Sequence, residues 1–233
     1  MTDAYDRGDV DEASRQGVLA GPAVVEEGLH SSVRATQLAS IAAAPYVEAR
    51  PELLPALADV ARGADRRTAI PAAQAARSIA RELATDDLPD DISEDDVMTW
   101  RALFDQIARN PSHFIEVRVL ALDTVASLAQ TITPSSIGFD LAIALDDHDP
   151  AFRAAAVQLV PRPTPASLRK PLAEAIVDDA DDKVALAAAN ALCGDHRDPA
   201  LALLGARGLE RVKKLVAGKA SRLTRDAMRC LKR

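Results

Sequence analysis

The chain has 233 residues and a formal net charge of −7; 48% of its residues are hydrophobic, but only seven are aromatic. Alanine and leucine account for 47 and 26 residues. Because these are strong helix formers, while the β-branched and aromatic residues favoured in strands are scarce, the composition excludes an all-β fold. The apolar content also excludes a chain that is disordered throughout.

The first segment, Met1–Ala20, is acidic and polar and does not resemble a signal peptide. We expect it to form an N-terminal cap or a partly ordered lead-in to the fold. No run of 18 apolar residues occurs in the sequence, so no transmembrane helix is expected. The sequence as written favours a cytoplasmic protein, and a periplasmic or secreted protein is the alternative if a signal peptide has been removed.

A recurring pattern then follows along the chain: an apolar residue, a small residue four positions later and an apolar residue eight positions later. These spacings place the three side chains on one helical stripe. In chain order the stripes begin at Val33, Ala72, Val117, Phe152, Val184 and Leu223, and the first of them has Gln37 at the small position. Another helix-like segment precedes several of them, at Pro51–Ala61, Asp95–Ala108, Ser135–Leu145 and Ala166–Val177.

Helix start signals agree with these segments, because an Asp or Thr stands directly before a proline at four places. The four residues are Thr133, Asp149, Thr164 and Asp198. Pro71 is expected to interrupt the second helix of the unit at 63–84. Each repeat is then a hairpin of two antiparallel helices, and a single hairpin cannot bury both of its faces, so the repeats must stack. We predict an all-α superhelix, or α-solenoid, of about five to six hairpins in a single domain over 1–233.

Two regions of this predicted domain stand out by their charge. Between Asp86 and Asp96 there are seven acids, which predicts an acidic, solvated loop between repeats at 85–96. Residues 207–233 hold ten Lys or Arg and two acids, a local charge of +8, so the preceding residues carry −15. We expect this last segment to be a basic capping repeat.

The segments LAIALDDHDPAFRAAAVQLV (141–160) and LAEAIVDDADDKVALAAANAL (172–192) resemble HEAT repeats. That family has a first helix, an aspartate-rich turn, and a second helix that opens with an apolar residue and arginine. Residues 110–128 are similar, 27–41 match more loosely, and armadillo-type or other α-solenoid repeats are the alternative for the weak units at 63–84 and 198–217. The resemblance implies that Asp146 or Asp147 pairs with Arg153 in a structural contact along the stack.

The basic C-terminal repeat is the best candidate for an interaction surface. Its cations alternate with apolar residues, and the candidate patch consists of Arg211, Lys214, Arg222, Arg225, Arg229 and Lys232. One interpretation is the polar outer face that every capping repeat needs. The other is a docking patch for an acidic partner, nucleic acid or an anionic membrane surface.

Cys193 and Cys230 are too few for a disulfide scaffold or a four-ligand zinc site. Counted from Val184 and Leu223, they lie about 160° apart around their helices. Since neighbouring parallel helices meet through opposite faces, the two can face each other between the last two repeats, or face away. A disulfide, which needs Cα atoms within about 7 Å, and a pair of buried thiols are therefore both open. A disulfide would indicate an oxidising compartment.

No motif in the sequence indicates catalysis, since a glycine-rich phosphate loop and a nucleophile elbow are both missing. No catalytic residue, cofactor or metal site is predicted, and the turn at 146–149 is expected to cap a helix rather than bind a metal ion. Trp100, Phe104 and Ile107 are spaced as a core stripe rather than as a base-stacking site.

The function predicted from the repeats is a non-enzymatic scaffold that binds a protein or peptide partner along the concave face lined by second helices. This prediction is an analogy at the level of the fold. Binding of nucleic acid or an anionic surface through the basic C-terminal repeat is the first alternative. An enzyme with a site in the concave groove is the second.

Overall fold

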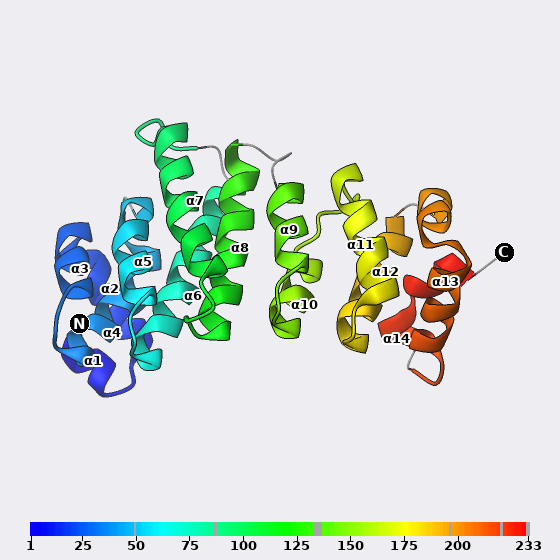
Figure 1. Ribbon diagram of the computed structural model, residues 1–233. Helices are drawn as coiled ribbons and strands as arrows, with labels where there is room; N and C mark the ends of the chain where they lie inside the picture. The colour runs from blue at the N-terminus through cyan, green and yellow to red at the C-terminus, as the bar shows by residue number, and fades with distance from the viewer. Residues whose placement is uncertain (49, 86–87, 133–136, 196, 220, 232–233) are drawn as a thin grey trace. The chain divides into compact units, whose positions relative to one another are not determined.

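The computed structural model describes residues 1–48, 50–85, 88–132, 137–195, 197–219 and 221–231, without the side chains of 137–139, 195, 197–201 and 221. These residues form helices and turns, and no strand occurs among them, which confirms the all-α prediction. The chain divides into two compact units, Met1–Pro134 and Ser135–Arg233 (Figure 1). The single domain over 1–233 stays a prediction.

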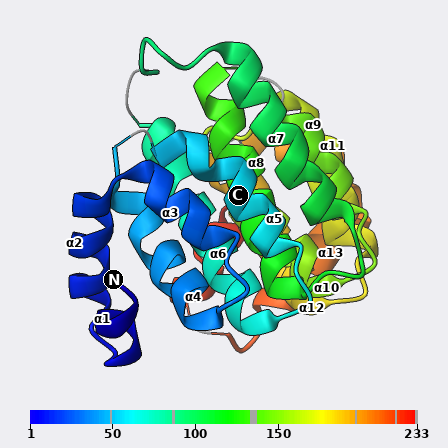
Figure 2. The same ribbon diagram turned by 90° about the vertical axis from the view of Figure 1, so that its left-hand side faces the viewer.

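The N-terminal unit consists of two leading helices and three helical hairpins. First helices α3, α5 and α7 form one row, and second helices α4, α6 and α8 form the other, with α2 packed against α4 (Figure 2). The helices are α1 (Thr2–Asp6), α2 (Val10–Ala20), α3 (Pro22–Leu29), α4 (Arg34–Ala43), α5 (Leu54–Ala61), α6 (Arg66–Leu83), α7 (Glu94–Arg109) and α8 (Ile115–Ile132), with 3₁₀ turns η1 (Ala44–Tyr46) and η2 (Arg50–Leu53).

The C-terminal unit repeats the same arrangement. Its first helices α9, α11 and α13 pack in one row, and α10, α12 and the last 3₁₀ turn η4 pack in the other. Its elements are α9 (Ile137–Leu145), α10 (Pro150–Gln158), α11 (Ala166–Asp178), α12 (Asp182–Asp195), α13 (Arg197–Val216), α14 (Ser221–Thr224) and η4 (Ala227–Leu231). The described residues therefore contain six hairpins, within the predicted number of five to six.

Most of the predicted stripes form the core. Val117, Phe152 and Val184 are buried, as are the small residues four positions after each of them. Two first members are exceptions. Val33 is 57% exposed because it is the N-cap residue of α4, and Leu223 is 66% exposed. The continuous helix expected after Leu223 is instead α14 followed by the 3₁₀ turn η4.

The expected break at Pro71 is wrong, because α6 continues through it for 18 residues. A proline inside a helix removes one hydrogen bond, here the one to the carbonyl of residue 67. Pro71 is only half-buried and Arg67 is exposed, so this carbonyl belongs to the solvent side of the helix. The opposite side is a buried alanine face that packs against neighbouring helices, and this packing holds α6 together.

The structure confirms the predicted helix start at Asp149 and differs from the predictions at Thr164 and Asp198. Asp149 caps α10 by accepting from the Ala151 N–H at 2.8 Å, with Pro150 at the first helical position, as expected. Thr164 does not cap α11; its hydroxyl donates to the Ala191 carbonyl at 3.2 Å. Asp198 lies inside α13, which begins at Arg197, and Thr133 lies outside the described residues. The acidic loop is shorter than predicted, since α7 begins at Glu94.

Small residues let α2 and α3 approach the second helix α4 closely. A Cβ added at Gly17 of α2 would overlap the side chain of Ala43, and one added at Gly28 of α3 would overlap the hydroxyl of Ser40. Glycine is therefore required at both positions by the neighbouring helix α4. The abundance of small residues has this packing role in addition to its effect on helix propensity.

Replacing Ser40 with alanine is expected to raise the stability of the N-terminal unit. The Ser40 side chain is fully buried, and its hydroxyl has no hydrogen-bond partner among the described residues. Removing an unsatisfied buried hydroxyl should stabilise the unit by about 1 kcal/mol. Ser14→Ala is the matched control, because the Ser14 hydroxyl donates to the Ala42 carbonyl at 3.0 Å and its loss should destabilise. Urea unfolding that shows the same loss for both variants would contradict this expectation.

Candidate functional site

The candidate basic patch is only partly free to meet a partner. Arg211 pairs with Asp182 at 2.7 Å, and Arg229 contacts Asp226 at 3.6 Å and donates to the Gly194 carbonyl. Lys214, Arg222 and Arg225 are exposed, and none has a side-chain partner within the described part of the chain. Lys232 lies outside that part. The patch stays a prediction, and its available charge is smaller than the sequence suggests.

The last segment of the chain, 221–231, is held on the second helix α12 by an asparagine. The amide nitrogen of Asn190 donates to the Leu223 carbonyl at 2.8 Å, and its amide oxygen accepts from the Ala227 N–H at 2.9 Å. Arg162 adds an ion pair to Asp226 at 3.3 Å. A side chain on the second-helix row thus binds peptide main chain through both the nitrogen and the oxygen of its amide group, which the sequence analysis did not anticipate.

Cys193 of α12 and Cys230 of η4 are joined in a disulfide, with an S–S distance of 2.05 Å and a Cα–Cα distance of 5.5 Å. The Cα separation lies inside the limit of about 7 Å that a disulfide requires. Both residues are buried. The covalent link therefore fastens 221–231 to α12 next to the contacts of Asn190. Its oxidation in the cell, and the oxidising compartment that this would imply, stay predictions.

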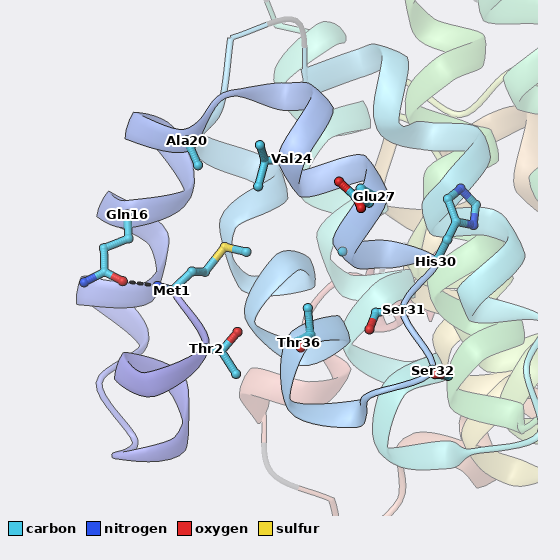
Figure 3. Close-up of a pocket in the computed structure, with 11 residues that line it drawn as sticks. Met1, Thr2, Gln16, Ala20, Val24, Glu27, His30, Ser31, Ser32 and Thr36 are labelled. Atoms are coloured by element: carbon cyan, nitrogen blue, oxygen red, sulfur yellow. Dashed lines mark hydrogen bonds between the residues drawn. The ribbon is translucent and has the colours of Figure 1, made fainter.

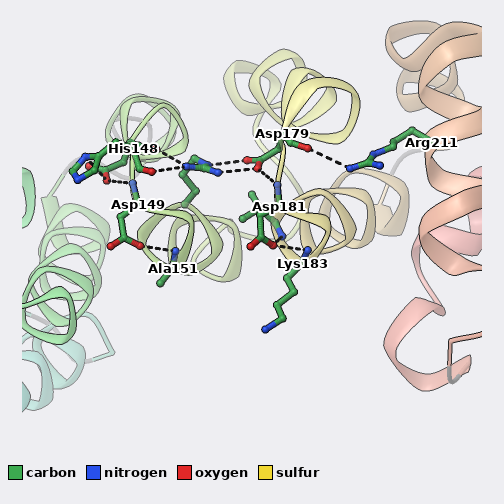
Figure 4. Close-up of polar contacts among 10 residues, drawn as sticks. His148, Asp149, Ala151, Asp179, Asp181, Lys183 and Arg211 are labelled. Atoms are coloured by element: carbon green, nitrogen blue, oxygen red, sulfur yellow. Dashed lines mark hydrogen bonds and ion pairs between the residues drawn. The ribbon is translucent and has the colours of Figure 1, made fainter.

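The aspartate-rich turns of the C-terminal unit share one construction (Figure 4). In each turn the first aspartate accepts from the N–H two residues later, Asp147 from Asp149 and Asp179 from Asp181, at 2.9 and 2.8 Å. The aspartate two residues later, Asp149 or Asp181, then caps the following helix by accepting from the N–H of Ala151 or Lys183. The turn at 146–149 is thus a capping structure, and among the described residues no group of three or more His, Cys, Asp or Glu is placed to hold a metal ion.

Arg153 connects these two turns. It donates to both carboxylate oxygens of Asp179 at 2.8 Å and to the carbonyl of Asp147 at 2.8 Å. The resemblance implied that Asp146 or Asp147 pairs with Arg153. In the structure Arg153 binds the backbone carbonyl of Asp147, and its carboxylate partner is Asp179 of the next turn. Burial raises the pKa of the Asp179 carboxyl, but the hydrogen bonds from Arg153 and the Asp181 N–H outweigh it and lower that pKa. The arrangement is a structural ion pair between repeats.

A cavity of about 320 Å³ lies beside this ion pair. Its polar lining consists of Arg153 together with Asp146, Asp147, Glu174, Asp178 and Asp179. Two arginines of α13 bind residues of this lining. Arg207 pairs with Asp178 at 2.9 Å, and Arg211 donates to the Asp179 carbonyl at 3.3 Å. The cavity therefore lies between the aspartate-rich turn that follows α9 and the end of α11, and arginines of α13 bind at its α11 side.

In the N-terminal unit the second-helix row has an open face on α6. The exposed residues Gln74 and Ser78 lie one turn apart on this face, and neither has a side-chain partner among the described residues. Beside them, Arg81 forms a two-pronged ion pair with Asp123 of α8, at 2.6 and 3.3 Å, and Arg77 approaches the same carboxylate at 3.7 Å. Two arginines thus share one carboxylate, and they lie next to the exposed polar side chains of Gln74 and Ser78.

A larger cavity of about 750 Å³ lies among α1, α2, α3 and the start of α4 (Figure 3). Ala20 and Val24 line one part of it, while Glu27, His30 and several hydroxyl groups line the rest. The lining places an apolar wall beside the Glu27 carboxylate, and the Met1 ammonium in the same lining donates to the Gln16 side chain. The apolar wall suits an apolar side chain.

The predicted core stripe on α7 is confirmed, since Trp100, Phe104 and Ile107 are all buried. His113 lies in the turn before α8, where burial, with Arg62 and Arg118 nearby, lowers the pKa of its imidazole. Among the described helices, none is long and apolar enough to cross a membrane.

No family model matches this sequence, and no curated protein matches it. Solved structures do match. A designed armadillo repeat protein in complex with the peptide (KR)4 is 16% identical with a TM-score of 0.52, over 89% of this chain and 96% of that one. An engineered protein is 17% identical with a TM-score of 0.54, over 89% and 95%. Kap121p is 17% identical with a TM-score of 0.58, over 95% of this chain and 22% of that one.

The fold is that of an armadillo/HEAT-like helical repeat solenoid. Identities of 16–17% establish the fold alone, and the chain spans about a fifth of Kap121p. Within this helical repeat fold, Asn190 and Gln74 were missed by the sequence analysis because single polar residues in a helix have no distinctive pattern. Their position opposite the buried stripe, on a second helix, was the one available signal.

Proposed function

We propose that the chain is a non-enzymatic scaffold that binds a protein or peptide segment along the second-helix row of its N-terminal unit. The observation that carries this proposal is the contact of Asn190 with the main chain of Leu223 and Ala227. There, a second helix of this protein binds peptide backbone through one donor and one acceptor on the same side chain.

The corresponding surface of the N-terminal unit is uncovered. Gln74 carries the same amide group as Asn190, with one carbonyl acceptor and two N–H donors, and it faces solvent. On helix α6 the exposed stripe runs from Arg67 through Gln74 and Ser78 to Arg81, which is a length of about 21 Å. A stripe of this length can accompany several residues of an extended peptide.

The charges beside the stripe indicate the chemistry of the partner. Arg77 and Arg81 share the single carboxylate of Asp123, so one positive charge is left without its own partner carboxylate there. An acidic side chain of the bound segment would form charge-assisted hydrogen bonds with these guanidinium groups. The designed armadillo repeat protein with bound (KR)4 supports a peptide as the class of ligand. The peptide expected here carries acidic rather than basic residues.

Selection of binders from a displayed library of random peptides tests this proposal. We expect the selected peptides to be enriched in Asp or Glu and to bind the intact chain. Gln74→Ala should weaken the selected peptides about tenfold, because two hydrogen bonds to their backbone are lost. Arg81→Gln should weaken acidic peptides more than neutral ones. Isothermal titration calorimetry with one acidic peptide and its amide analogue measures both effects.

Gln106→Ala is the matched control for Gln74→Ala. Gln106 is exposed on the first helix α7, so the same substitution there removes an amide that faces away from the second-helix row. Binding should be unchanged in this variant. Equal affinities of the Gln74 and Gln106 variants, or selected peptides without acidic residues, would contradict the proposal.

A further inference from the structure

The last segment of the chain combines positive charge with exposed apolar side chains. Leu223 is 66% exposed and Met228 is 38% exposed, on either side of the exposed Arg225, with Arg222 next to Leu223. We call Arg222–Met228 the basic segment; its one acid, Asp226, is paired with Arg162. Large apolar side chains that face solvent together with cations mark an interaction surface rather than a simple polar cap.

The opposite combination occurs at the first helices of the chain. Residues 1–33 hold seven acids and two arginines, a net charge of −5. Leu19 of α2 is 86% exposed, and it lies one turn after Gln16, which lines the 750 Å³ cavity together with Ala20. We call Leu19 together with this cavity, where Ala20, Val24 and Glu27 lie (Figure 3), the acidic surface.

We propose that the basic segment of one molecule docks on the acidic surface of a second copy of this chain. The charges of the two surfaces are opposite, and each surface also exposes large apolar side chains. Leu223 would enter the cavity against Ala20 and Val24, while Arg222 or Arg225 would meet Glu27. Burial of Leu19 and Leu223 supplies the hydrophobic contribution, and the opposite charges supply orientation and rate.

The symmetry of this contact decides what it builds. The two surfaces are different parts of the chain, so after one contact the first copy keeps a free acidic surface and the second copy keeps a free basic segment. These two remaining surfaces either pair with each other, which closes a dimer, or bind further copies. The inference is independent of the proposed peptide binding, which uses α6 rather than either of these surfaces.

Sedimentation velocity of the intact chain is the first test. The sedimentation coefficient should rise with protein concentration at low salt and fall towards that of a monomer of 24.7 kDa at high salt. Arg222→Glu/Arg225→Glu and Leu19→Lys/Glu27→Lys should each remain monomeric. Lys170→Glu/Lys183→Glu changes the net charge as much as the first variant but alters exposed residues of other helices, so it should associate like the original protein.

Mixing the two monomeric variants gives a sharper result. Each variant keeps one intact surface, so an equimolar mixture should form a dimer of one copy of each and no larger species. A mixture that stays monomeric would overturn the proposal, as would a monomeric original chain at low salt. A monomeric original chain that binds duplex DNA in a salt-dependent manner would assign the basic segment to nucleic acid instead.

Discussion

Reduction of the Cys193–Cys230 disulfide should lower the free energy of unfolding of the C-terminal unit by about 4 kcal/mol. The link closes a loop with a sequence separation of 37 residues, and the loss of loop entropy in the unfolded chain gives this magnitude. Both cysteines are buried, so the reduced thiols keep nearly the same packing. The difference between oxidised and reduced protein therefore measures the cross-link itself.

Urea unfolding with and without a thiol reductant, followed by far-ultraviolet circular dichroism, measures this change. Hydrogen exchange should locate it in 221–231 and the end of α12. The Cys193→Ala/Cys230→Ala variant should behave like the reduced protein in both conditions, which controls for effects of the reductant. Identical unfolding of the oxidised and reduced protein would contradict the expectation.

The second large effect is expected at Arg153. Its side chain is 15% exposed and that of Asp179 is 5% exposed, so Arg153→Ala leaves a buried carboxylate without its cation. The carbonyl of Asp147 also loses a donor. Breaking a buried pair by removing one partner typically costs about 3–5 kcal/mol of unfolding free energy. Because Arg153 is partly exposed, we expect a loss of about 3 kcal/mol.

Arg207→Ala is the matched control, because Arg207 and Asp178 form an ion pair of similar length whose side chains are 77% and 61% exposed. Such a pair contributes about 1 kcal/mol or less. Both variants remove an arginine from the same edge of the C-terminal unit. Urea unfolding that shows equal losses for the two would indicate that burial of the Arg153 pair has no energetic consequence.

The same pair predicts how stability depends on pH. The pKa of Asp179 is lowered in the folded protein from its usual value of 3.8. A lowered pKa contributes stability that is fully present above the unfolded value and is lost as the pH falls through the folded value. Thermal unfolding below about pH 4 should therefore show a steeper loss of stability in the original protein than in Asp179→Asn.

The repeat architecture could be predicted from the sequence because it depends on local periodicity. Val117, Phe152 and Val184 are buried at the positions that the stripe pattern assigns, and α7 buries Trp100 as expected. Burial of an apolar residue every four positions is a property of one helix and needs no knowledge of its neighbours. The number of hairpins follows from the number of such stripes.

The failures occur where contacts from outside a helix decide the outcome. Pro71 is tolerated because neighbouring helices pack on the buried face of α6, and local propensity alone predicts a break. Leu223 faces solvent because Asn190 and the disulfide hold 221–231 in a short helix and a 3₁₀ turn. The candidate site on α6 depends on Asp123 of α8, which lies 42 residues from Arg81. Such pairings are set by the stacking of repeats.

The link between Cys193 and Cys230 also bears on the order in which the C-terminal unit comes apart. In a stack of repeats each unit is supported by its neighbours, so an end repeat has one neighbour and normally frays first. Here the final turn η4 is bonded covalently to the preceding repeat. Fraying from that end would have to open two repeats together, so the oxidised unit should open first elsewhere along the stack.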